Sequence, residues 1–271
     1  MNLNTVGTVI NKFNDQAVLY AAKICSVLES KGITVLNEEE IPESKEADLI
    51  LAFGGDGTIL RAAQYALNKE SPVLGLDFGR LGFLAEKVPE KPSDLAEIIL
   101  TQELTEEKRM ILTVERDGCE PLWGVNDAVI SRGGYARLIS LEVNVNGNPA
   151  SRMLADGLVI ATPTGSTGYS ISAGGPVVSP DVDCMTVTPV CPHSLQQRPL
   201  VVSGESEITV AIGDDPYQAA ILQIDGQNRG ILKQKDIIRV KKDQRMIRVL
   251  RLNRTNYYSL VQSKLSEWGT I

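Results

Sequence analysis

The chain has 271 residues, of which 43% are hydrophobic and 23% charged, and its formal net charge is −7. This is the composition of an ordinary globular protein with enough interior for one large domain or two of usual size. The acidic excess argues against a general nucleic-acid binder, which needs a basic surface, but it leaves room for a small phosphate-bearing ligand.

Two further features of the sequence argue against a zinc protein and a membrane protein: few cysteine and histidine residues, and no long apolar stretch. The four cysteines are scattered and there is a single histidine, so the sequence does not predict a zinc cluster. Scattered thiols are typical of a reducing compartment. No basic segment followed by an apolar run stands at the N-terminus, and no stretch has the length of a membrane span. We therefore expect a cytoplasmic protein without a membrane or nucleic-acid partner.

The first hundred residues alternate between β-type runs and helical periodicity. The expected strands are Val6–Ile10, Thr34–Leu36, Leu49–Phe53 and Val73–Leu76, and the expected helices are Asp15–Ser30, Thr58–Asn68 and, capped by Ser93, Asp94–Leu100. The run Leu49–Phe53 is continuously apolar, as in a strand that is buried on both faces. The alternation predicts an α/β domain with a parallel sheet over residues 1–109.

From Met110 onward the chain changes to short strands with few helical stretches. The expected strands are Ile111–Glu115, Ile139–Val145, Leu158–Ala161, Ile208–Ile212, Ala220–Ile224 and Met246–Leu250. Asn146-Gly147 and Asp225-Gly226 are tight-turn signals between such runs. We therefore predict a β-rich, sandwich-like domain over residues 110–252. Thr255–Trp268 is helical in pattern, and residues 253–271 are expected to form a C-terminal helix that packs on the N-terminal domain.

A glycine loop with one carboxylate follows the strand Leu49–Phe53. Ligands of open parallel sheets bind beyond the carboxyl ends of the strands, where glycines let backbone N–H groups approach phosphate oxygens. Asp56 in this loop has the chemistry to orient or deprotonate a hydroxyl, or to hold a metal. The alternative interpretation is a glycine turn whose aspartate only caps the next helix. Neither the usual P-loop nor the usual dinucleotide fingerprint is present.

Several motifs in order along the chain resemble the NAD kinases. They are Gly54–Thr58 (GGDGT), Leu81–Leu84 (LGFL), Asn126-Asp127, Asp156-Gly157, Thr162–Pro176 (TPTGSTGYSISAGGP), Pro192–Leu195 (PHSL) and Arg198–Leu200. GGDGT is shared with lipid kinases and phosphofructokinases, so by itself it identifies only a superfamily. The fifteen-residue motif from Thr162 is specific to NAD kinases. The resemblance extends from Gly54 to Gln227.

The resemblance implies a phosphotransferase with two domains and its active site between them. The implied reaction transfers the terminal phosphoryl group of ATP, with Mg²⁺, to the 2′-hydroxyl of the adenosine ribose of NAD, which gives NADP. The implied partners are small-molecule nucleotides, and relatives are commonly homodimers or homotetramers. Two other functions stay open at this point: a lipid or sugar kinase that shares GGDGT, and a catalytically silent nucleotide-binding sensor.

Site residues are carried over from the family position by position. Asp56 is the implied catalytic residue, within a phosphate loop made of Gly54, Gly55, Gly57 and Thr58. The implied NAD contacts are Asp56, Gly57, Phe83, Asn126, Asp127, Arg137, Asp156, Thr164, Thr167, Gly168, Tyr169, Ser172 and Gln227. The metal ligands of the protein stay unknown at this point, because Mg²⁺ is commonly held mainly by donor phosphates and waters.

The resemblance implies more specific roles for some of these residues, and for one of them a purely structural role is the alternative. The Asn126 amide can read an adenine edge, and Asp127, which is glutamate in many members, can hold a ribose hydroxyl. Asp156 is implied near the nicotinamide riboside, although Leu154 stands where many relatives have arginine. For Tyr169 the alternative is a core aromatic whose hydroxyl bonds to backbone.

Overall fold

A computed structural model describes residues 3–79, 82–134, 137–194, 196–214, 220–252 and 257–268. Leu81 of the LGFL motif, Leu195 of the PHSL motif and the expected helical residue Thr255 lie outside the described residues. The chain divides into two compact units, unit 1 (Met1–Lys108 and Ile247–Ile271) and unit 2 (Arg109–Met246). In the part of the chain that the structure describes, no helix is both long and apolar enough to cross a membrane.

Unit 1 is an α/β layer structure built on parallel strands. Its elements are β1 (Thr5–Ile10), α1 (Asp15–Ser30), β2 (Thr34–Leu36), β3 (Leu49–Phe53), α2 (Asp56–Lys69), β4 (Val73–Asp77), β5 (Glu86–Lys87), α3 (Pro92–Thr101), the start of β6 (Thr105–Arg116), the end of β17 (Ile237–Arg251) and α5 (Tyr257–Trp268). Strands β2, β1, β3 and β4 are neighbours in that order and pair in parallel. The predicted parallel sheet is confirmed.

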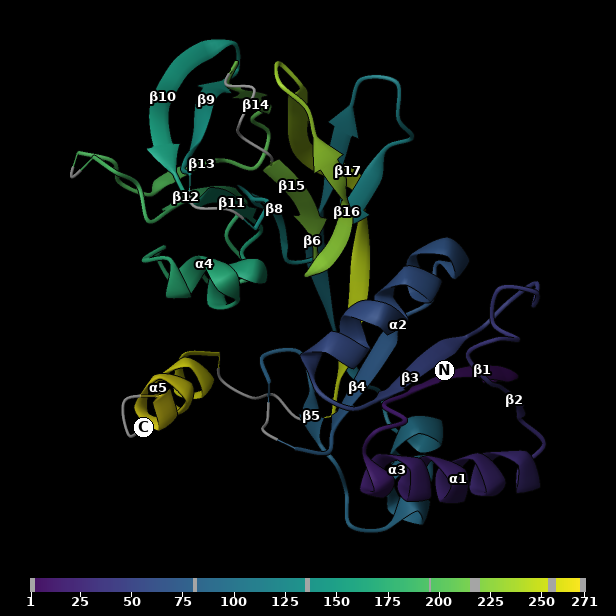
Figure 1. Ribbon diagram of the computed structural model, residues 1–271. Helices are drawn as coiled ribbons and strands as arrows, with labels where there is room; N and C mark the ends of the chain where they lie inside the picture. The colour runs from purple at the N-terminus through teal and green to yellow at the C-terminus, as the bar shows by residue number, and fades with distance from the viewer. Residues whose placement is uncertain are drawn as a thin grey trace. The chain divides into compact units, whose positions relative to one another are not determined.

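Helices α1, α2 and α3 of unit 1 cover both faces of this sheet. Apolar residues of α1 and α3 share one core with alternate residues of β3 and β4, among them Leu51 and Leu74. Helix α2 packs on β3, β4 and β1 from the other face (Figure 1), where the absence of a side chain at Gly75 makes room for Ile59. Because both faces are covered, β3 is buried along its whole length, as its continuous apolar run predicted.

Two helix starts differ from the sequence prediction. Helix α2 begins at Asp56 rather than Thr58, with Gly55 as its N-cap. Helix α3 begins at Pro92 after Lys91, so the prediction of Ser93 as a cap is wrong. The Ser93 hydroxyl instead lies 3.1 Å from Oδ1 of its neighbour Asp94. Proline suits a first helical position because its missing N–H would be unpaired there in any case.

Unit 2 is a sandwich of antiparallel strands. Its elements are the rest of β6 and β17, β7 (Leu122–Gly124), β8 (Asp127–Arg132), β9 (Ile139–Val145), β10 (Asn148–Ala155), β11 (Gly157–Ala161), a 3₁₀ turn η1 (Gly165–Thr167), α4 (Tyr169–Ser172), β12 (Cys184–Val190), β13 (Leu200–Ser203), β14 (Ile208–Ile212), β15 (Ala220–Ile224) and β16 (Gln227–Leu232). One sheet has the order β13-β12-β11-β8-β15-β16, and β10, β9, β14 and β17 are neighbours in the other. The predicted β-rich second half is confirmed.

The core of unit 2 lies between these two sheets. Leu158 and Ile160 of β11 face residues such as Val143 and Val210 of the other sheet in one apolar cluster. Their neighbour Val159 joins a second cluster with Val129 on the opposite face. The antiparallel pairing of β11 with β8 places the end of β11 beside the start of β8, with Ala161 paired to Asp127. The segments that adjoin these two strand ends carry most of the predicted NAD contacts.

Candidate functional site

The glycine loop of unit 1 lies at the carboxyl end of β3 and leads directly into α2. The Gly54 N–H donates to Leu76 O at the end of the neighbouring strand β4. The N-terminus of α2, with its positive dipole end, therefore stands at the sheet edge where parallel α/β proteins bind anions.

The Asp56 carboxylate is held by backbone rather than serving as a helix cap. Its Oδ2 accepts the N–H of Phe83 at 2.9 Å, and its Oδ1 accepts the N–H of Leu84 at 3.1 Å. Asp56 is the first residue of α2, one position after the N-cap, so the cap interpretation is wrong. The residue is only half-buried. Each carboxylate oxygen has lone-pair capacity for a further donor, such as a substrate hydroxyl.

The approach of the 82–84 segment to Asp56 requires glycine. A Cβ atom on Gly82 would lie 2.0 Å from Asp56 Oδ1 and 2.3 Å from its Cγ. Real Cβ contacts are never this short, so any side chain at Gly82 displaces the carboxylate or the segment. The glycine of the LGFL motif is thus explained by Asp56, and the predicted contact Phe83 is the next residue in the same segment.

A second carboxylate, Asp77, lies at the end of β4. Burial raises the pKa of Asp77 above its ordinary value, and the charge of Asp56 adds to the rise, while the N–H of Gly79 and the charge of Lys264 oppose it. Among the described residues, Oδ1 of Asp77 is buried without a hydrogen-bond partner. Unit 1 therefore carries a second carboxylate, Asp77, that senses the charge of Asp56, and only Asp56 was predicted.

In unit 2 the segment that contains Asn126 is fixed against the segment from Thr162. The Thr162 N–H donates to Asn126 O at 2.9 Å, and the Thr162 hydroxyl donates to Val125 O at 2.7 Å. A Cβ on Gly165 would lie 2.0 Å from Asn126 O. The two motifs, which stand about forty residues apart in the sequence, are therefore packed backbone to backbone.

Asp225 holds this segment from the other side. Its carboxylate accepts the N–H groups of Val125 at 2.8 Å, Asn126 at 2.7 Å and Asp127 at 3.2 Å. Its own N–H donates to Asp127 O at 3.1 Å. Asp225 adopts a left-handed backbone conformation, with φ of 49°, in the turn that follows β15. The sequence indicated a tight turn here, but a turn signal carries no information about these distant acceptor contacts.

Asp127 is a buried carboxylate, and no cation among the described residues compensates its charge. Burial raises its pKa from 3.8 to about 7, and the nearby charge of Asp225 adds to the rise. Burial also raises the pKa of Asp225, although its three N–H donors and the charge of Arg229 oppose that rise. Near neutral pH, Asp127 can therefore offer either a proton donor or an acceptor to a ligand.

The Asn126 side chain has an unused acceptor. Its Oδ1 atom is buried and has no hydrogen-bond partner within the described ranges. A Cβ on Gly168 would lie 3.9 Å from Asn126 Nδ2 and 3.8 Å from Asp127 Oδ2, so these three predicted residues are neighbours. An unpaired buried acceptor costs about 1–3 kcal/mol, which a ligand that supplies an N–H donor recovers.

The motif from Thr162 contains two short helical turns rather than one open loop. Thr164 and Thr167 are buried around η1, where the Thr167 hydroxyl donates to Thr164 O at 3.2 Å. Tyr169 and Ser172, at the two ends of α4, are exposed. The side chain of Tyr169 is 44% exposed, so the interpretation as a core aromatic is wrong and the ring is available to a ligand.

Three predicted contacts lie apart from the group formed by Asn126, Asp127 and residues 162–168, or on its border. Asp156 precedes β11, at the opposite end of that strand from Thr162, and pairs with Arg132 at 3.1 Å. Arg137 is exposed and follows β8 near the same end. Gln227 is exposed at the start of β16, opposite Ile224. The structure thus brings together Asn126, Asp127 and the 162–168 segment, but it does not bring Asp156 or Arg137 to them.

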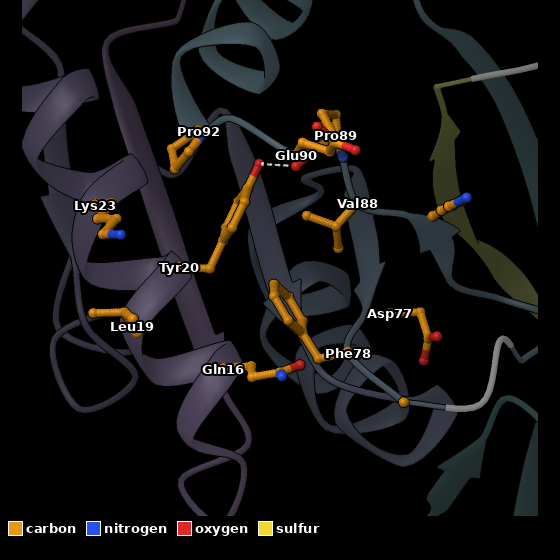
Figure 2. Close-up of a pocket in the computed structure, with 12 residues that line it drawn as sticks. Gln16, Leu19, Tyr20, Lys23, Asp77, Phe78, Val88, Pro89, Glu90 and Pro92 are labelled. Carbon is orange, nitrogen blue, oxygen red and sulfur yellow. Dashed lines mark hydrogen bonds between the residues drawn. The ribbon is translucent and has the colours of Figure 1, made fainter.

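Among the described residues of unit 1, two cavities are lined by none of the predicted site residues. The larger has a volume of about 660 Å³ and is lined by α1, the end of β4 and the segment before α3. Figure 2 shows Tyr20 and Phe78 in its wall, with the Tyr20 hydroxyl bonded to Pro89 O at 2.9 Å, and Asp77 at its side. The smaller, about 490 Å³, is lined by residues that include Lys12 and Arg61.

Comparisons with known proteins agree along the whole chain. Residues 42–104 match the family described as ATP-NAD kinase N-terminal domain, and residues 125–252 match the ATP-NAD kinase C-terminal domain. The NAD kinase of Desulforamulus reducens is 35% identical over 98% of this chain and 98% of its own. The NAD kinase of Geobacter metallireducens is 39% identical over 93% of this chain and 88% of its own.

Solved structures support the same assignment. Yeast NADH kinase, crystallised with NADH, superposes with a TM-score of 0.84 and 25% identity over 97% of this chain and 86% of its own. An NAD kinase from Archaeoglobus fulgidus, crystallised with ATP, gives a TM-score of 0.74 and 27% identity over 93% and 95%. With both domain descriptions matched and relatives above 30% identity over nearly its full length, this chain belongs to the ATP-NAD kinase family.

Proposed function

We propose that the chain transfers the terminal phosphoryl group of ATP to the 2′-hydroxyl of the adenosine ribose of NAD, and that Asp56 is its catalytic residue. The observation that carries the proposal is the placement of Asp56. Its carboxylate stands at the N-terminus of α2, fixed by the N–H groups of Phe83 and Leu84. A fixed carboxylate beside an anion-binding helix end can orient a sugar hydroxyl toward a phosphate.

Asp56 acts mainly by positioning in this proposal. Phosphoryl transfer has a loose transition state with charge spread over the equatorial oxygens, so orientation and charge stabilisation matter more than early proton removal. The carboxylate accepts a hydrogen bond from the 2′-hydroxyl and takes its proton as the new O–P bond forms. The N–H groups of Gly55 and Gly57 are the proposed donors to phosphate oxygens, whereas the Thr58 N–H already donates to Gly55 O at 2.9 Å.

Unit 2 supplies the proposed contacts to NAD. The unpaired Oδ1 of Asn126 accepts from the adenine amino group, and its Nδ2 donates to a ring nitrogen. Asp127, with its pKa raised to about 7, exchanges a hydrogen bond with a ribose hydroxyl. The exposed ring of Tyr169 packs against the dinucleotide. The remaining family contacts, at Thr164, Thr167, Ser172, Asp156, Arg137, Gln227 and Phe83, are proposed on the resemblance.

The described residues fit a magnesium ion that arrives with the donor. Within the described ranges, no group of three or more His, Cys, Asp or Glu side chains could hold a metal alone. Mg²⁺ is usually bound by one or two carboxylates together with substrate phosphates and waters. The unpaired Oδ1 of Asp77, whose carboxylate senses the charge of Asp56, suits that mode. When bound, the ion would neutralise charge on the donor phosphates.

The cellular setting and assembly are proposed by family analogy. We propose a cytoplasmic enzyme that works as a homodimer or homotetramer. The scattered free cysteines are compatible with a reducing compartment.

One assay tests the reaction and the role of Asp56. The protein is incubated with NAD, ATP and Mg²⁺, and NADP is measured with an NADP-specific dehydrogenase. We expect Asp56→Asn to lower kcat by at least 1,000-fold while the Kd for NAD, measured by calorimetry, changes less than fivefold. Asp15→Asn is the matched control, because Asp15 is likewise the first residue of a helix but is exposed on α1.

The outcomes separate the alternatives. A wild-type protein that binds NAD but forms no NADP is a nucleotide-binding sensor, and one that phosphorylates only lipid or sugar hydroxyls is another GGDGT kinase. If Asp56→Asn turns over like the wild type, Asp56 has no part in the mechanism.

A further inference from the structure

A buried arginine lies behind the segment that holds Asp56. Arg251, the last residue of β17, has a side chain that is only 9% exposed. Its Nη1 donates to Leu84 O at 2.9 Å, and its Nη2 donates to Phe83 O at 3.1 Å. The carbonyls of Phe83 and Leu84 therefore point at the guanidinium, while the N–H groups of the same two residues point at Asp56.

Arg251 is itself fixed by two carboxylates. Its Nη1 lies 3.0 Å from Glu86 Oε1, and its Nε lies 2.9 Å from Glu107 Oε2. Glu86 is almost fully buried, at 4% exposed, whereas Glu107 is 38% exposed. A planar fork with donors on all three nitrogens can satisfy two carbonyls and two carboxylates at once, which an ammonium group cannot do with the same geometry.

Simple stabilisation does not explain this arrangement well. Placing an ion pair in the interior costs desolvation that its attraction repays only with very good geometry, and apolar pairs of similar volume are often as stable. Here the ion pair of Arg251 and Glu86 also anchors the segment of residues 82–87, in which the two-residue strand β5 is the regular structure. What the ion pair adds is a fixed orientation for the peptide groups of Phe83 and Leu84.

We infer that Arg251, locked by Glu86, is a positioning residue for phosphoryl transfer, because it orients the Phe83 and Leu84 peptides whose N–H groups hold the Asp56 carboxylate. This inference rests on the proposed catalytic role of Asp56. Loss of Arg251 lets the segment rotate, and the carboxylate then loses its two donors. Misplacing a reacting group by about 1 Å can cost about 100-fold in rate, so the effect falls on kcat.

The principal test replaces the ion pair without leaving a buried charge. In the double variant Arg251→Met with Glu86→Leu, both buried charges are removed together, so we expect a folded protein. We expect kcat to fall 10- to 100-fold while KM for NAD changes less than fivefold. Arg251→Lys keeps a positive charge beside Glu86 but loses the fork, and we expect kcat between those of the double variant and the wild type.

A matched control lies three residues away on the same strand. Arg248 also pairs with a glutamate, since its Nη2 lies 2.7 Å from Glu106, but its side chain is 42% exposed. We expect Arg248→Gln to keep kcat within twofold of the wild type. Circular dichroism and thermal melting of every variant separate loss of folding from loss of turnover.

Each outcome has a distinct meaning. If the wild type forms no NADP, the proposed function fails. If the wild type is active but Asp56→Asn is equally active, the role of Asp56 fails. If Asp56→Asn is inactive while the folded double variant and Arg251→Lys both turn over within threefold of the wild type, the inference about Arg251 is overturned. If the double variant does not fold, the folded Arg251→Lys decides by the same threefold limit.

Discussion

Replacing Asp127 by asparagine should make the protein more stable at pH 8 and leave its stability nearly unchanged at pH 4. Burial, with the charge of Asp225, raises the pKa of Asp127 from 3.8 to about 7 in the folded protein. Between these values the folded state retains a proton that the unfolded state has released. The free energy of unfolding of the wild type therefore falls as the pH rises through this window.

The size of the effect follows from the pKa difference. One pKa unit corresponds to about 1.4 kcal/mol, so ionising Asp127 in the folded protein costs about 4 kcal/mol by pH 8. Asparagine is nearly isosteric and never ionises, which removes this cost. We expect the stability gained by Asp127→Asn to grow from near zero at pH 4 to several kcal/mol at pH 8.

Urea unfolding followed by far-UV circular dichroism, at closely spaced pH values from 4 to 8.5, measures this gain. Asp214→Asn is a suitable control, because Asp214 is 64% exposed and its ion pair with Lys235 lies at the surface, where such pairs contribute little. Parallel pH profiles for the wild type and Asp127→Asn would refute the reasoning, because they would mean that Asp127 ionises as freely in the folded chain as in the unfolded one.

Two further predictions test the geometry of the two units. Gly82→Ala should lower kcat at least tenfold, because the added Cβ meets Asp56 Oδ1 at 2.0 Å, whereas Gly79→Ala, which has open space around the added atom, should keep kcat within twofold. Tyr169→Ala should raise KM for NAD about 5- to 100-fold if the exposed ring packs on a base, since such stacking contributes about 1–3 kcal/mol. Tyr169→Phe should keep KM within about twofold, and an unchanged KM for the alanine variant would exclude the ring from the site.

The hydrophobic periodicity and the turn residues were sufficient to predict the fold class. Leu49–Phe53 was predicted as a doubly buried strand from its apolar run alone, and β3 has these bounds. The start of α3 was predicted wrongly because Ser93 is a good cap by residue type, whereas the backbone places Pro92 at the first position. Local residue preference cannot distinguish neighbouring caps when the approach of the chain decides between them.

Candidate site residues could be proposed from the sequence where the residue type itself supplies the chemistry, as at Asp56 and Asn126. Residues that act by hydrogen bonding to the backbone of a distant segment could not be predicted from the sequence. Asp225 contacts segments about 100 residues away, and Arg251 contacts segments about 167 residues away. A lone aspartate in a turn or an arginine at a strand end has many surface roles, so only the fold reveals these partners.

Asp56 of unit 1 and Asp127 and Asp225 of unit 2 differ in how their charge is compensated, and that difference distinguishes the roles proposed for them. Asp225 accepts three N–H groups and Asp56 accepts two, so each charge is met by fixed backbone dipoles. Asp127 is as buried as a core residue, yet the charge that it senses is another carboxylate. A fold gains nothing in stability from such a group. Its position at the start of β8, after Asn126 with its unpaired amide oxygen, is therefore best explained by a ligand whose donors and acceptors complete both side chains.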